Sequence, residues 1–111
     1  MYICVTCNME ELTGFQRDVL YVVLHEEHPS GQSIRRKMEE HYNENINHGR
    51  LYPNLDTLVE SGLLNKGKKD ERTNEYQITS KGKDKIVSRQ IWLNKNIENT
   101  GIESDINKMM S

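Results

Sequence analysis

The spacing of apolar residues changes abruptly at Ser61-Gly62, and this change limits the folds open to the chain. Upstream, apolar residues recur three and four positions apart, as on one face of an amphipathic helix. Downstream, residues 63–68 and 74–79 have the period of short strands, with Tyr76 and Ile78 on one face. The charged connection between them has a turn composition. The sequence therefore predicts helices followed by a β-hairpin.

Two helices are expected before the central stretch. The first begins near Thr13, a suitable N-cap, and ends where Pro29 and Gly31 oppose continuation. Ser30 or Ser33 can open the second, whose apolar positions are Ile34, Met38 and Tyr42.

The third expected helix covers about residues 47–60 and carries a proline near its start. Proline is costly in a helix interior but is tolerated in the first turn, where N–H groups lack internal partners. A start near Gly49 or Arg50 puts Pro53 close to the end of that tolerated zone, and Gly62 ends the helix as a left-handed residue. The free N–H groups then point outward and favour a phosphate. The apolar face consists of Leu51, Leu55, Leu58 and Val59.

Composition sets broad limits on the chain. With 111 residues and 34% hydrophobic content, it can form one small domain with a modest core. No apolar run approaches the roughly 20 residues of a membrane span, and no signal peptide is visible, so we expect a cytoplasmic protein. The net charge of −2 is unevenly spread, with −4 over residues 1–34, +3 over 35–89 and −1 over 90–111. The central basic excess favours a nucleic-acid partner.

Three helices followed by a strand-loop-strand form the arrangement of a winged helix-turn-helix, an α+β fold that is mostly helical. Its third helix presents its start to the major groove, and the hairpin loop is a wing that reaches the neighbouring backbone. We expect a flexible leader over 1–10, a winged helix-turn-helix DNA-binding domain over 11–79, a C-terminal dimerisation helix over 80–98 and a flexible tail over 99–111.

The stretch HGRLYPNLDTLVESGLL, with the later NEYQITSKGK, resembles the PadR-like winged-helix transcriptional regulators, and LTGFQRDVLYVVL adds a resemblance to the short archaeal members. The resemblance covers roughly Leu12 to Arg89 and implies a dimeric DNA-binding regulator. Many members have Ser or Thr before the glycine of the motif, whereas this chain has Asn-His-Gly. This leaves Asn47, His48 and Gly49 open as the N-cap. The matching positions are Gly49, Leu51, Tyr52, Pro53, Leu55, Leu58, Gly62, Leu63, Tyr76, Ile78, Thr79 and Gly82.

Polar residues at the start of the third helix are the first candidate DNA contacts. Arg50 lies off the apolar stripe and is favoured for a guanine or phosphate contact. Asn47, His48 and Asn54 share this end of the helix. Tyr52 can either reach a phosphate through its hydroxyl or pack against the second helix.

Basic residues elsewhere are expected to contact the DNA backbone. Arg35, Arg36 and Lys37 point in different directions on a helix, so only one can face the DNA, and Arg36 is the candidate chosen. The wing adds Lys68, Lys69 and Arg72.

The predicted function is sequence-specific binding of double-stranded DNA by a transcriptional regulator that represses by occluding a promoter. The alternative is a winged-helix protein–protein interaction module without DNA binding, which the acidic net charge would suit.

The last helix, capped by Thr79 or Ser80, has more apolar surface than one small domain can cover. We therefore expect a homodimer, which the resemblance also implies and which would supply two DNA half-sites. Trp92 lies off the main stripe, and a small-molecule effector near it is left open. The predicted dimer seam consists of Ile86, Gln90, Leu93 and Ile97.

Cys4 and Cys7 have the spacing of half a structural zinc site, but no second pair of ligands exists. They are assigned to the leader, with a metal shared across a dimer or a redox switch left open, and Met9 is an alternative start of the protein. The sequence shows no Gly-rich phosphate loop, nucleophile elbow or His/carboxylate cluster. It therefore predicts no enzyme, metal site or cofactor.

Overall fold

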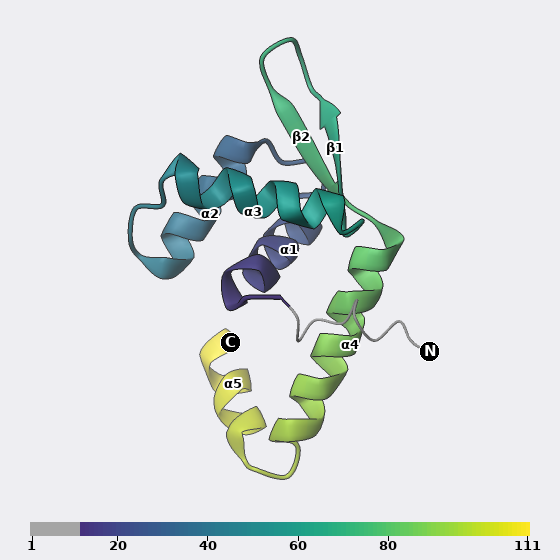
Figure 1. The fold of residues 1–111 in the computed structure, drawn as a ribbon. Coiled ribbons are helices and arrows are strands. Elements are labelled where there is room, and N and C mark those ends of the chain that lie inside the picture. The colour runs from purple at the N-terminus through teal and green to yellow at the C-terminus, as the bar shows by residue number, and fades with distance from the viewer. Residues whose placement is uncertain (1–11) are drawn as a thin grey trace.

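The computed structural model describes residues 12–111, so Cys4, Cys7, Met9 and the expected leader lie outside the described residues. The described chain is mostly helical, with a single antiparallel hairpin, and the predicted winged helix-turn-helix is confirmed (Figure 1). The elements in chain order are α1 (Gly14–Glu26), α2 (Gly31–Tyr42), α3 (His48–Glu60), β1 (Leu64–Lys68), β2 (Asn74–Ile78), α4 (Ser80–Ile97) and α5 (Ile102–Met110).

Side-chain caps begin the first four helices. Thr13 and Gln16 form a reciprocal capping box at α1, as the S/T-x-x-E/Q pattern predicts. Ser30 caps α2 by accepting from the Ser33 amide at 3.1 Å. Of the candidates for α3, Asn47 is the N-cap. Because each cap needs only residues within one turn, these helix starts are readable from local sequence.

The core lies where α1, α2 and α3 meet the inner face of the hairpin. α3 crosses α1 and α2, and the hairpin projects beyond the helices as a wing (Figure 1). The amide of Tyr76 donates to the Pro29 carbonyl at 2.9 Å, which joins β2 to the chain just before α2. The side chains that are at most 1% exposed are Val19, Leu20, Val23, Ile34, Met38, Ile46, Leu51, Leu55, Leu58, Leu64 and Tyr76.

Thr79 connects the end of α3 to the start of α4. Its hydroxyl donates to the Gly62 carbonyl at 2.7 Å and accepts from the Gly82 amide at 3.0 Å. Gly62 has φ +79°, the left-handed conformation expected of it. Gly82 packs directly against the Leu63 carbonyl, and a side chain there would overlap it. The hairpin root and α4 are therefore held in one orientation.

The end of the chain differs from the sequence prediction. The flexible tail expected after Asn99 contains α5, which follows Gly101 at φ +87° and turns back beside α4 (Figure 1). The missed signal is the spacing of Ile102, Ile106 and Met109, which puts apolar side chains on one helical face. All residues of α5 are exposed, so its apolar face is largely open among the described residues 12–111. No helix in the described part of the chain is long and apolar enough to cross a membrane.

Candidate nucleic-acid interface

The start of α3 is organised by Asn47. The Asn47 Oδ1 accepts a hydrogen bond from the Arg50 amide at 2.9 Å, which caps one of the free N–H groups.

Because α3 begins at His48, Pro53 is its sixth residue and lies beyond the first turn. The expectation that Pro53 falls at the end of the tolerated zone is therefore wrong. Its missing N–H removes the helical hydrogen bond to the Gly49 carbonyl.

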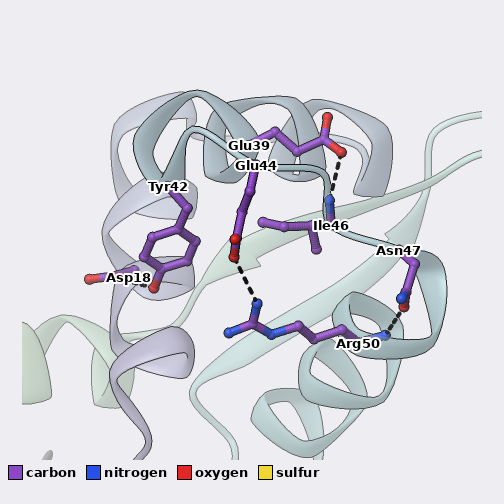
Figure 2. A network of polar contacts seen from close by, with 7 residues as sticks. All are labelled: Asp18, Glu39, Tyr42, Glu44, Ile46, Asn47 and Arg50. Carbon is purple, nitrogen blue, oxygen red and sulfur yellow. Dashed lines mark hydrogen bonds and ion pairs between the residues drawn. The ribbon is translucent and has the colours of Figure 1, made fainter.

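The sequence favours Arg50 as a DNA contact, but the Arg50 side chain turns toward α1 and α2 (Figure 2). Its guanidinium carbon lies 4.1 Å from the centre of the Phe15 ring. Its Nη1 atom lies 3.7 Å from Oε1 of Glu44, in the connection between α2 and α3. Arg50 thus has partners within this chain that the sequence did not reveal.

His48 and Tyr52 lie together on α3. Their rings are stacked, with centres 5.2 Å apart and planes inclined by 11°. The Tyr52 ring packs against Gly31 at the start of α2, which is one of the two alternatives for Tyr52. His48 remains exposed beside it.

Asn54 links α3 to α1. Its Oδ1 accepts from Nε2 of Gln16 at 2.8 Å, and its Nδ2 donates to the Arg50 carbonyl at 2.7 Å. Both ends of the amide are therefore used within the chain. The second N–H of Nδ2 and the second lone pair of Oδ1 are not used by these two bonds and remain open to a base.

Arg36 lies on α2 and its Nη2 donates to the Ser33 hydroxyl at 3.4 Å. It borders a hollow that is also lined by Glu26, Glu39 and Glu44. A DNA phosphate at this hollow would meet several carboxylates. The surroundings of Arg36 are thus less favourable to an anion than its sequence position suggested.

The wing carries the candidate cations Lys68, Lys69 and Arg72, all exposed. The turn is held by Asp70, whose Oδ1 accepts from the amides of Arg72 and Thr73, each at 2.9 Å. These hydrogen bonds hold the pKa of the Asp70 carboxyl below its usual range, and the bond from the Arg72 amide lowers it most. Within residues 12–111, none of the three cations forms an ion pair.

A hollow lies between the start of α2, α3 and the part of the wing formed by the turn and the first half of β2. Its lining includes Gly31, Tyr52, Arg72 and Asn74. Tyr52, with His48 stacked on it, and the wing cation Arg72 therefore border one depression.

The predicted dimer seam on α4 is only partly available. Ile86 is 7% exposed and belongs to the chain's own core, so little of its side chain is open to a second copy. The side chain of Gln90 accepts from the Tyr21 hydroxyl at 3.4 Å. Leu93 and Ile97 are half-buried. The exposed apolar side chains on α4 are Val87, Ile91 and Trp92.

Comparisons with known proteins agree with this arrangement. Residues 19–88 match the family described as "Transcriptional regulator PadR-like family". A search of curated protein sequences gave no significant match.

Among solved structures, the chain is similar to RosR of H. salinarum, with 40% identity and a TM-score of 0.80 over 93% of this chain and 97% of that one. A complex structure designated hsRosR-S1 has 41% identity and a TM-score of 0.80, covering 91% and 90% of the two chains. F93 from STIV, described as a winged-helix DNA-binding protein, shares the fold at 18% identity and a TM-score of 0.59, over 77% and 89%. The family match and the identity to RosR together establish that the chain belongs to the PadR-like family of transcriptional regulators.

Proposed function

We propose that this chain binds double-stranded DNA sequence-specifically as a homodimer and represses transcription by covering a promoter. The observation that carries the proposal is the hollow bordered by Tyr52 of α3 and Arg72 of the wing. A DNA backbone that passes between a recognition helix and a wing would run along such a depression. Polar groups border it on the side of α2 and α3, and polar groups together with the cation Arg72 border it on the side of the wing.

The structure suggests a division of roles among the candidate residues. His48 is exposed at the start of α3 and is proposed to contact base edges, while the Tyr52 ring, packed on Gly31, supports it by stacking. Lys68, Lys69 and Arg72 are proposed to hold the backbone beside the wing. Asn47 and Asn54 support the helix start through their hydrogen bonds.

The homodimer is proposed from the apolar surface that this chain leaves open. Val87 and Ile91 are 55% and 50% exposed on one side of α4. On α5, Ile102, Ile106, Met109 and Met110 are also exposed. A second copy could cover both sets of side chains through a two-fold contact and would bring a second recognition helix. The proposed seam therefore keeps Leu93 and Ile97 and adds Val87 and Ile91.

The first experiment is to incubate purified protein with sheared genomic DNA from its source and to sequence the recovered fragments at several salt concentrations. Enrichment of a short inverted repeat would support a dimeric regulator and identify its operator. The affinity should fall steeply as salt rises, because binding releases counterions. Recovery without sequence preference would contradict specific recognition. No recovery at low salt would instead favour the protein–protein interaction module.

A further inference from the structure

Arg50 is the third residue of α3, and its side chain closes the gap between this helix and α1. The guanidinium covers the Phe15 ring at 4.1 Å, a distance typical of a cation–π contact. Phe15 is only 7% exposed and belongs to the core cluster. Arg50 therefore packs on a buried core residue that is part of α1.

A second contact joins Arg50 to the connection that precedes α3. Glu44 lies 3.7 Å away, and both side chains are about half-exposed or more, at 47% for Arg50 and 62% for Glu44. An ion pair this open is weak by itself. Together with the aromatic contact, however, it fixes the direction of the guanidinium fork, because the fork must satisfy both partners.

The remaining groups near Arg50 are also held in place (Figure 2). The Tyr42 ring lies 5.9 Å from the guanidinium carbon and stacks on Phe15. The Tyr42 hydroxyl donates to Asp18 on α1. In the connection, the Ile46 amide donates to the Glu39 carboxylate at 2.8 Å. The environment of Arg50 is thus aromatic and acidic on the side that it faces.

We infer that Arg50 is a positioning residue, which sets how the start of α3 sits on α1 and α2 and makes no contact with a base. This inference rests on the proposed function, since DNA binding is its readout. Contact with a base would draw the guanidinium away from the Phe15 ring and would compete with Glu44 for Nη1. A bare Glu44 carboxylate would then remain near the approaching phosphates and repel them.

The test compares Arg50→Lys, Arg50→Ala and Glu44→Gln with the unmodified protein, using the recovered operator and a salt series. Lysine keeps the charge but lacks the planar fork. It can therefore replace arginine in a phosphate contact better than in a stacked contact with an aromatic ring. We expect both Arg50 variants to weaken operator binding by a similar factor, roughly tenfold. The order of preference among sequences and the slope of log K against log salt should stay unchanged. Glu44→Gln removes both a partner of Arg50 and a negative charge near the DNA, so it should leave the order of preference among sequences unchanged.

A base or phosphate reader would behave differently on each measure. Arg50→Lys would retain phosphate binding, and Arg50→Ala would lower the salt slope by about one or relax specificity at one base pair. Any of these results would overturn the inference. If the unmodified protein bound no DNA, the proposed function would fail and this inference with it.

Nuclear magnetic resonance supplies a readout that loss of fold cannot imitate. In the free protein, the Arg50 Nε–H and the Phe15 ring protons should show a mutual contact, and the Arg50 signal should be shifted by the ring. Adding operator should leave both signals in place while the His48 and Arg72 signals move. A large change at the Arg50 Nε–H on adding DNA would contradict the positioning role. The backbone spectra of the variants show whether each remains folded.

Discussion

Tyr52 of α3 lies so close to Gly31 of α2 that a Cβ atom at Gly31 would fall 2.7 Å from the Tyr52 ring. On α3, the Tyr52 ring is stacked on His48. The two helices of the helix-turn-helix unit therefore approach each other through a glycine, and the aromatic pair beside the wing depends on that approach. This relationship joins core packing to the proposed DNA surface.

Gly31→Ala should lower the free energy of unfolding by about 1–3 kcal/mol, because the added methyl group must displace the Tyr52 ring. Urea denaturation measures this change. Gly14→Ala is a matched control, since Gly14 is likewise the first residue of its helix but has nothing within 4 Å of an added Cβ. The control should be neutral or slightly stabilising. Equal losses in the two variants would contradict the importance of the Tyr52 contact.

Combined replacement of Lys68, Lys69 and Arg72 by alanine should weaken DNA binding to a similar degree for all sequences. The slope of log K against log salt should fall by about one for each lost phosphate contact. Fluorescence anisotropy over a salt series gives both quantities. Lys95→Ala, an exposed cation in the last turn of α4 and far from the wing, should leave the slope unchanged. A loss of affinity for the operator without a similar loss for other DNA sequences would show that the wing reads sequence instead.

Much of the fold follows from local signals in the sequence. The caps Thr13, Ser30 and Thr79 satisfy free N–H groups within their own first turns, so their role is visible without tertiary contacts. The change to a period of two, with Tyr76 buried, likewise predicts the hairpin. The family resemblance in the third helix added the DNA-binding function, which composition alone suggested only weakly.

The partners of the site residues were beyond sequence reasoning because they come from distant parts of the chain. The Asn54 amide accepts from Gln16, 38 residues away. Arg50 meets Phe15 from a different helix. Nothing in the spacing of residues distinguishes an exposed arginine from one that rests on an aromatic ring. For α5, a single short apolar stripe after Gly101 was too brief to stand out.

Ile91→Glu and Leu93→Glu should each yield monomers by size-exclusion chromatography with light scattering. Each substitution puts a carboxylate into the proposed seam, where a second copy would have to bury it without a partner. Ile91 is half-exposed, so its replacement should leave the monomer's unfolding temperature nearly unchanged. As a control for Ile91→Glu, Asn96→Glu adds the same charge about 140° around α4 from Ile91 and should remain dimeric. A dimer that persists in both variants would show that the two copies associate elsewhere.

Tyr42 should make the stability of the protein depend on pH in the alkaline range. Burial, and then the hydrogen bond to Asp18, raise the pKa of the Tyr42 hydroxyl to about 12. The native state thus favours the protonated phenol, whose usual pKa is near 10. The stabilisation is fully present below about pH 10 and is lost as the pH rises toward 12, amounting to at most about 2 kcal/mol.

Denaturant unfolding from pH 8 to 12 measures the loss of stability, and tyrosinate absorbance follows the ionisation of the tyrosines. Tyr42→Phe should flatten the part of the stability curve between pH 10 and 12 and remove one late-ionising tyrosine. An unchanged curve would mean that another group controls alkaline unfolding.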